Sequence, residues 1–204
     1  MKFGVLLLLS VGMAVTAAHA QTPAAPAVAA PAARPTRYTT GNGLTTFFST
    51  APIEDIEALN AKVGAIFELA TGELAFSMLM SDFQFKNTLM QEHFNENYAE
   101  SEKYPRARLT GKLRAVPEEA ALRAGPQPVE VLGQLTIHGV TRKVRVPGTL
   151  QLRGTDLVVT SKFVVAPADY RIKIPALVRN NIAKSIDVSV IMTCQPAPAV
   201  TASR

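Results

Sequence analysis

Apolar and polar residues alternate along most of the central part of the chain. Between Val129 and Ile137, the odd-numbered positions are mainly apolar and the residues between them are mainly polar. A period of two predicts a β-strand that buries one of its faces. Comparable runs recur along the chain and indicate a domain built mainly from strands; they cover residues 63–69, 74–80, 107–113, 144–146, 157–165 and 186–192.

Glycine-containing turn signals separate these runs. Thr71-Gly72, His138-Gly139 and Gly154-Thr155 stand between pairs of runs at the spacing of β-hairpins. Pro147-Gly148 is expected to interrupt a strand, because proline lacks a backbone N–H. Hairpins in succession predict mostly antiparallel pairing, and several short strands at this spacing predict an all-β sandwich or barrel.

One stretch breaks the period of two and predicts a helix over residues 87–99. Thr88, with Gln91 three positions later, resembles a capping box at its start. Residues 53–60 fit either a helix start or an irregular strand, and residues 169–184 are expected to be irregular. Six residues share one face of the predicted helix: Leu89, Met90, His93, Phe94, Asn97 and Tyr98.

The two ends of the chain differ in composition from its centre. Residues 1–20 have a basic start, a short apolar run and small residues at a cleavage site, which together predict a signal peptide cut after Ala20. We therefore expect a periplasmic or secreted protein. Residues 21–36 are rich in Ala and Pro and are expected to form a linker. Residues 37–194 form one domain, and a disordered tail is expected over residues 195–204.

Composition excludes several classes of function. The net charge of +5 is modest, no basic cluster stands out and Trp is absent, so nucleic acid is not an expected partner. Cys194 has no second cysteine with which to form a disulfide, and it fits a packing role better than a nucleophile. No nucleophile elbow, phosphate-binding glycine loop or metal-spaced pair of histidines occurs. The sequence therefore predicts neither an enzyme nor a bound metal or other cofactor.

Three segments share a recognisable order and spacing. The first comprises Phe83–Asn87, Met90–Glu96 and Tyr104-Pro105, the second Gly133–Thr141, and the third Asp169–Pro175 leading into a final strand near Ile186–Ile191. Over residues 38–194 these segments resemble the YceI-like polyisoprenoid-binding family. Residues 45–58 depart from the commonest opening of that family, so the resemblance is a weaker guide to the first strand pair.

The resemblance implies an extended, lipocalin-like antiparallel barrel of about eight strands with one or two short helices. It further implies an elongated apolar pore for a polyisoprenoid, a quinone-like molecule or another amphiphilic lipid. An exported protein, often a homodimer, is implied as well. We expect such a protein to carry or store its ligand.

Bulky apolar residues on inward faces are the candidates for lining such a pore. Long apolar ligands bind by leaving water, and flexible Met side chains adapt to their shape. His93 is a candidate for contacting a ligand head group at the pore mouth. The remaining candidates come from strands (Phe67, Phe76, Met78, Met80, Leu135, Ile137 and Phe163) and from the predicted helix (Leu89 and Phe94).

Three other classes of function compete with the lipid-binding hypothesis. The same apolar residues are equally consistent with a filled barrel, acting as a structural or interaction protein of the cell envelope without a ligand. An integral outer-membrane barrel fits poorly, because the polar faces carry many Lys and Arg residues and aromatic residues are few. An enzyme on a lipocalin-like scaffold remains an alternative because fold alone does not determine function.

Overall fold

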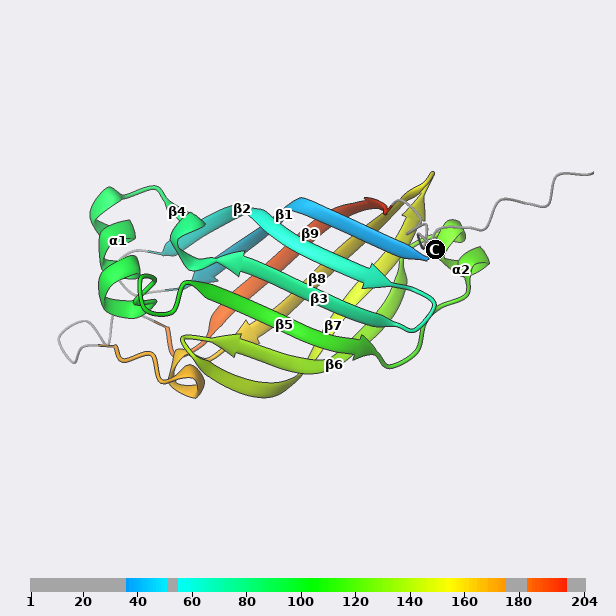
Figure 1. Ribbon diagram of the computed structural model, residues 1–204. Coiled ribbons are helices and arrows are strands. Elements are labelled where there is room, and N and C mark those ends of the chain that lie inside the picture. Colours follow the sequence, from blue (N-terminus) through cyan, green and yellow to red (C-terminus); the bar gives the residue numbers. More distant parts are fainter. Residues whose placement is uncertain (1–35, 51–54, 175–182, 198–204) are drawn as a thin grey trace, which may run out of the picture. The chain divides into compact units, whose positions relative to one another are not determined.

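The computed structural model describes residues 36–50, 55–174 and 183–197. In these ranges the chain forms nine strands with short helices between them (Figure 1). The strands are β1 (Arg37–Ser49), β2 (Ile56–Glu68), β3 (Glu73–Leu79), β4 (Gln84–Phe85), β5 (Arg106–Leu113), β6 (Gln127–Ile137), β7 (Val140–Arg153), β8 (Asp156–Val165) and β9 (Ile186–Pro196). The helical elements are η1 (Met80–Asp82), α1 (Thr88–His93), the π-helical turn η2 (Phe94–Tyr98), α2 (Glu119–Ala124) and η3 (Pro167–Tyr170).

Eight of the strands close into an antiparallel barrel. Their order is β1-β9-β8-β7-β6-β5-β3-β2, and β2 pairs again with β1 to complete the ring. The two-residue strand β4 pairs only with β2 and lies outside the ring. The predicted antiparallel barrel of about eight strands is therefore confirmed. Among the described residues, no helix has the length and apolar character needed to cross a membrane.

Alternation along the strands sorts side chains between the barrel interior and solvent. In β5, Ala107 and Leu109 are buried whereas Arg106 and Arg108 are exposed. Consecutive side chains on a strand point to opposite faces, so this pattern gives one apolar and one charged surface. Two-residue turns connect neighbouring strands, as at His138 and Gly139, where φ is 50° and 71°. Positive φ at both positions matches the twist of the flanking strands.

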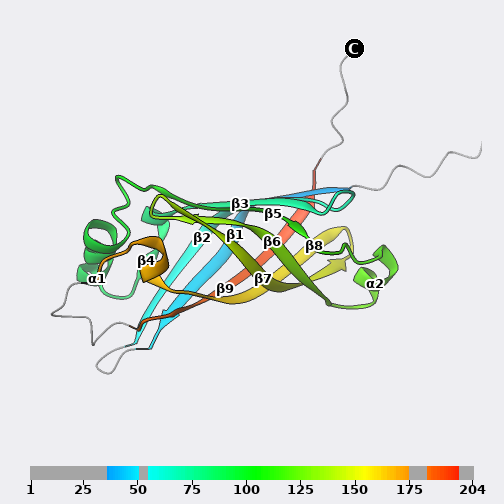
Figure 2. The same cartoon turned by 90° about the horizontal axis from the view of Figure 1, so that it is seen from below.

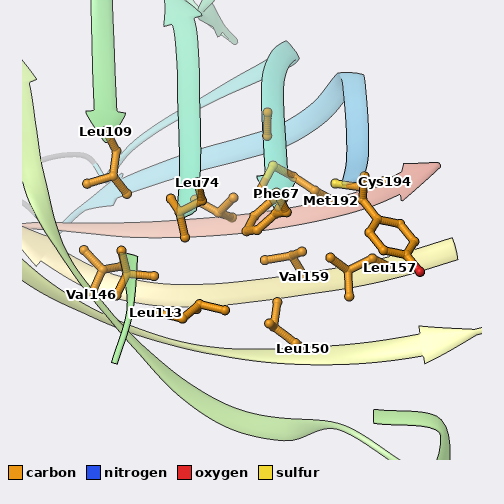
Figure 3. Close-up of a cluster of buried hydrophobic side chains, with 14 of the residues drawn as sticks. Phe67, Leu74, Leu109, Leu113, Val146, Leu150, Leu157, Val159, Met192 and Cys194 are labelled. Carbon is orange, nitrogen blue, oxygen red and sulfur yellow. The ribbon is translucent and has the colours of Figure 1, made fainter. Parts of the chain in front are cut away.

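The barrel has two different ends. Figures 1 and 2 both place α1 at one end and α2 at the other. At the α2 end, Leu122 is buried in the main hydrophobic core together with Tyr38 and Cys194. Figure 3 shows core side chains from strands that are not paired with each other, such as Leu109 on β5 and Val146 on β7, pointing toward one another. This half of the barrel is therefore packed largely with apolar side chains.

The structure also corrects several expectations about local structure. Residues 56–60 belong to β2, which selects the strand alternative. Pro147 does not interrupt β7: it pairs with Glu130 of β6, and its carbonyl oxygen accepts a hydrogen bond from Ser161 Oγ at 2.6 Å. The short helix α2 was not predicted.

The chain ends lie partly beyond the described residues. The predicted signal peptide, most of the linker and residues 198–204 are outside them, as are residues 175–182 of the predicted irregular segment. At the C-terminal end, the expectation of disorder from residue 195 is wrong for two residues. Gln195 pairs with Thr39, and Pro196 pairs with Tyr38, because β9 continues along β1 as the barrel closes.

Candidate functional site

A cavity of about 150 Å³ lies inside the barrel at the end that carries α1. Inward-facing strand residues form part of its wall, and the segments that cover this end form the rest. Almost all of these side chains are apolar. The strand residues are Thr45, Phe47, Ser49, Ile56, Met78, Ala107, Ile137, Val165, Ile186 and Val188; the covering residues are Met80, Phe83, Phe85, Met90, Phe94, Tyr98, Ala99, Pro167, Ile172 and Ile174.

A second cavity, of about 70 Å³, lies further along the same strands. On β6, Ile137 lines the larger cavity and Leu135 lines the smaller one. The same step of two residues separates Met78 from Phe76 on β3. Residues two apart on a strand share one face. The two cavities therefore follow one another along the barrel interior.

Four phenylalanines form a cluster in the wall of the larger cavity. Phe47 comes from β1, Phe85 from β4, Phe83 from the residue before β4, and Phe94 from η2. The ring centroids of Phe94 lie 5.0 Å from Phe85, 5.6 Å from Phe47 and 5.7 Å from Phe83. These distances are typical of stabilising aromatic pairs. The cluster therefore attaches the helical cover to the barrel wall.

The cover begins at a side-chain cap. Asn87 Oδ1 accepts hydrogen bonds from the backbone N–H groups of Leu89 at 2.9 Å and Met90 at 3.3 Å. The expected capping box is therefore wrong by one residue, since the cap is Asn87 and not Thr88. Gln91 Oε1 instead accepts a hydrogen bond from Phe85 N, which joins the helix to β4. The predicted helix itself is present as α1 and η2.

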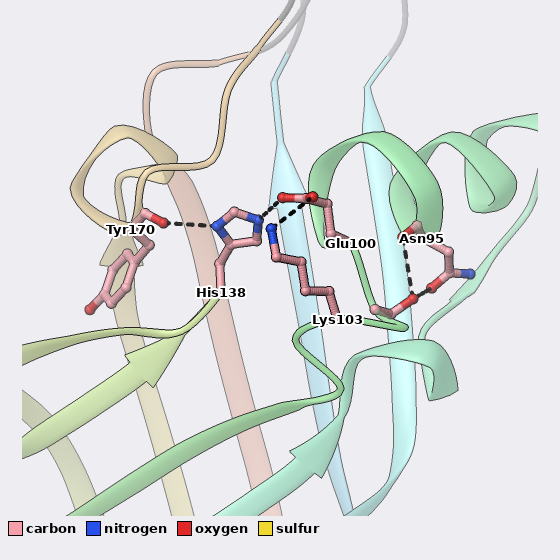
Figure 4. Close-up of polar contacts among 6 residues, drawn as sticks. Asn95, Glu100, Lys103, His138 and Tyr170 are labelled. Atoms are coloured by element: carbon pink, nitrogen blue, oxygen red, sulfur yellow. Dashed lines mark hydrogen bonds and ion pairs between the residues drawn. The ribbon is translucent and has the colours of Figure 1, made fainter.

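A polar contact joins the two segments that cover the cavity (Figure 4). His138, in the β6–β7 turn, lies 2.5 Å from Glu100 Oε2 through Nε2 and 3.2 Å from the Tyr170 carbonyl oxygen through Nδ1. A carbonyl oxygen only accepts hydrogen bonds, so Nδ1 donates to Tyr170, and Nε2 shares a second hydrogen bond with the Glu100 carboxyl group. Lys103 also lies 3.8 Å from Glu100. His138 thus connects the chain after η2 to η3.

The polar groups of the larger cavity are few. Ser49 Oγ accepts a hydrogen bond from Ala183 N at 3.2 Å, whereas Thr45 Oγ1 has no partner among the described residues. Burial raises the pKa of the Tyr98 phenol above its ordinary value. Among the described residues that line this cavity there is no Lys or Arg. The site is therefore suited to apolar or uncharged molecules.

The structure divides the predicted ligand-contacting residues into three sets. Met78, Met80, Ile137 and Phe94 line the larger cavity. Phe67, Phe76, Leu135 and Phe163 line the smaller one. Leu89 and His93 line neither.

The expectation that Leu89 and His93 face the pore is corrected by the orientation of the helix. Both side chains are exposed, and Leu89 retains 57% of its accessible surface. Met90, Phe94 and Tyr98 are spaced by four residues and are the helical residues that turn toward the cavity. Leu89 and His93 each precede one of them by a single position, which rotates their side chains away from the barrel.

Several lining residues were missed by sequence reasoning. Phe83 and Phe85 alternate with a polar residue, which is a signal for one shared face, but the run is too short to be distinguished from a loop. Phe47 and Thr45 lie in the segment that departs from the commonest family opening. Nothing in the local sequence indicates that β1 brings them beside α1 and η2.

Within the described ranges, no group of three or more His, Cys, Asp or Glu side chains is arranged to hold a metal ion. Cys194 is fully buried in the core, and burial raises the pKa of its thiol to about 12. A thiol in this environment stays protonated at neutral pH and is a poor nucleophile.

Comparison with known proteins agrees with this geometry. The YceI-like domain matches residues 45–194, and no curated protein matches the chain. A polyisoprenoid binding domain from Saccharophagus degradans has the same fold, with a TM-score of 0.68 at 16% identity, over 80% of this chain and 100% of that one.

Two further solved structures share the fold. BcnA from Burkholderia cenocepacia has a TM-score of 0.63 at 14% identity, over 74% of this chain and 95% of its own. The YCEI protein of Campylobacter jejuni has a TM-score of 0.58 at 13% identity, over 73% and 90%. The match over most of the described barrel shows that this chain belongs to the YceI-like domain family.

Proposed function

We propose that this protein binds a long apolar molecule inside its barrel and carries or stores it. The observation that carries this proposal is the pair of successive cavities, which are lined by apolar side chains from one end of the barrel toward its middle. Apolar walls favour apolar ligands, because binding removes apolar surface from water. A polyisoprenoid, a quinone-like molecule or another amphiphilic lipid has a tail of suitable chemistry.

The shape of the larger cavity supports entry from the α1 end. Met90, Phe94 and Ile174 line the cavity and are partly exposed, so the apolar wall continues to the surface there. Met80 is buried in the wall, and Met78 is partly buried there. Unbranched Met side chains change shape at low cost, which would lengthen the space available to a chain.

The comparisons and the leader sequence add independent support. The Saccharophagus degradans domain of similar fold is described as polyisoprenoid-binding. Residues 1–20 have the pattern of a signal peptide, which favours action in the periplasm or after secretion. A binding role without catalysis is consistent with the buried, protonated Cys194 thiol. Homodimer formation remains a prediction from the family resemblance.

Filling the larger cavity provides the test. Ala107 is 1% exposed and lines the cavity, so Ala107→Leu introduces three carbon atoms into the ligand space. Thr110 lies on the same strand and is exposed, so Thr110→Leu is the matched control. Each protein is purified natively from its own host, and organic extracts are analysed by mass spectrometry.

We expect a stoichiometric lipid in the wild-type and Thr110→Leu extracts and little or none in the Ala107→Leu extract. Ala107→Leu should remain folded, because each CH₂ group that becomes buried in the cavity stabilises the folded state by about 0.8 kcal/mol. Clean wild-type extracts, together with no thermal shift on adding polyprenol or quinone, would contradict lipid binding. The filled-barrel alternative, with function on the outer surface, would then be preferred.

A further inference from the structure

Thr45 is a polar residue in the wall of an otherwise apolar cavity. It lies on the inward face of β1 and is 1% exposed. Its strand neighbours are Asn60 on β2 and Val190 on β9. Val190 lines the smaller cavity, whereas Val188 lines the larger one. Thr45 therefore lies at the inner end of the larger cavity, near the middle of the barrel.

The Thr45 hydroxyl has no hydrogen-bond partner among the described residues, and its oxygen is buried. Nearby buried polar side chains are satisfied. Asn60 Nδ2 donates to the Leu79 carbonyl oxygen at 2.8 Å, and Asn60 Oδ1 accepts from Lys62 N at 2.9 Å. A buried hydroxyl without a partner costs free energy, which valine in its place would avoid. Such a group is explained by a partner that binds in the cavity.

Water is a poor partner at this position. An ordered buried water makes about three hydrogen bonds to protein groups. Apart from Thr45, Ser49 and Tyr98, the described side chains that line the cavity are apolar and offer a water no hydrogen bond. A ligand oxygen needs only the one hydrogen bond that Thr45 offers, since the rest of the ligand contacts the apolar wall.

The charge of the lining limits the chemistry of that oxygen. Because none of the described residues that line the cavity is Lys or Arg, a carboxylate or phosphate beside Thr45 would lose its water without gaining a counter-charge from them. An uncharged carbonyl, ether or hydroxyl oxygen has a much smaller desolvation cost. A threonine hydroxyl can donate to any of these and can accept from a hydroxyl.

We propose that Thr45 determines ligand specificity by hydrogen bonding to one uncharged oxygen of a lipid held within the barrel. The inference rests on the proposed lipid-binding function and adds the chemical class of the ligand. The preferred ligand is a long apolar chain that carries a carbonyl, ether or hydroxyl group at mid-barrel depth. A pure hydrocarbon of the same length binds more weakly, and so does a chain whose buried end is ionised.

The experiment compares two probes that differ only in one oxygen. Binding of a saturated long-chain hydrocarbon and of the methyl ketone of equal length is measured by displacement of a fluorescent lipid probe. The proteins are the wild type, Thr45→Val, Thr45→Ser and Thr46→Val. Thr46 lies next to Thr45 and faces away from the cavity, so Thr46→Val is the matched control. Unfolding without ligand is measured in parallel.

We expect the wild type and Thr46→Val to bind the ketone roughly five- to tenfold more tightly than the hydrocarbon, as one buried hydrogen bond allows. Thr45→Val should bind both probes equally, with unchanged or tighter hydrocarbon binding and no loss of thermal stability. Thr45→Ser should restore the preference.

Two results would overturn the proposal. If Thr45→Val keeps the ketone preference, or weakens both probes by the same factor, Thr45 has no role in specificity, although lipid binding stands. The second result is that the fluorescent lipid does not bind the wild type and Thr46→Val, or that it binds both proteins and is displaced by neither probe. In either case the proposed function fails together with the inference.

Discussion

Replacing Gly133 with alanine should destabilise the barrel at one defined place. Gly133 on β6 pairs directly with Gly111 on β5, and both belong to the inward-facing sets of their strands. A Cβ at Gly133 would lie 2.5 Å from the Thr110 carbonyl oxygen and 3.1 Å from Gly111 Cα. Both atoms are backbone, so no flexible side chain can move to make room.

The size of the effect follows from this geometry. An ordinary carbon–oxygen contact is about 3.3 Å or longer, so the strands would have to separate by roughly 0.8 Å. Separation on that scale takes neighbouring β5–β6 hydrogen bonds beyond the usual upper limit of about 3.2 Å between nitrogen and oxygen. We expect Gly133→Ala to lower the free energy of unfolding by about 2–3 kcal/mol. For a domain of this size that corresponds to a fall in Tm of about 5–10 °C.

Urea unfolding and thermal melts of the ligand-free protein measure this change. Gly125→Ala is the matched control, because Gly125 has an extended backbone with φ of 168° and a Cβ there would meet no atom within 4 Å. The control should be neutral or more stable by about 0.4–1 kcal/mol, since alanine restricts the unfolded chain. Equal stability of Gly133→Ala and the wild type would refute the close approach of β5 and β6.

Three further predictions concern the core and the cover. Cys194 should resist alkylation by iodoacetamide at pH 8 in the folded protein and react fully in denaturant; rapid modification of the folded protein would contradict its burial. Burial raises the pKa of the Cys194 thiol from 9.0 to about 12, so the thiolate forms at lower pH in the unfolded chain than in the folded protein. The free energy of unfolding should therefore fall as the pH rises from about 9 to about 12. Urea titrations at pH 8 and pH 10 should show a larger fall in the free energy of unfolding for the wild type than for Cys194→Ala. Equal falls in the two proteins would contradict the raised pKa of Cys194. His138→Asn should keep the turn, since asparagine tolerates positive φ, but remove the contacts to Glu100 and the Tyr170 carbonyl. Hydrogen exchange should then quicken in residues 94–104 and 166–172 and stay unchanged in β8 and β9, whereas unchanged exchange in the cover would show that His138 does not hold it.

The sequence by itself determined the architecture of the barrel. Alternation in segments such as Val129–Ile137 identifies strands, because side chains on a strand point to opposite faces. His138 and Gly139 mark a hairpin because few residue pairs adopt positive φ at both positions. The helix after residue 87 was visible from its different period, and the family resemblance supplied the closure of the sheet into a barrel.

Only the tertiary structure decided what each inward residue faces. Leu135 and Ile137 have the same pattern in the sequence, yet they line different cavities, because periodicity encodes the side of a strand and not the depth along the barrel. Leu89 has the character of a lining residue and is exposed, since the barrel covers one narrow stripe of its helix.

The composition of the site likewise depends on contacts between distant segments. Phe47 meets Phe94 because the closing of β1 against β2 and the return of α1 and η2 over the barrel end bring them together. The Thr45 hydroxyl, which has no partner among the described residues, can be recognised only from the positions of its neighbours in the folded chain. Strand identity is a local property of the chain, whereas a cavity depends on the packing of all the strands that surround it.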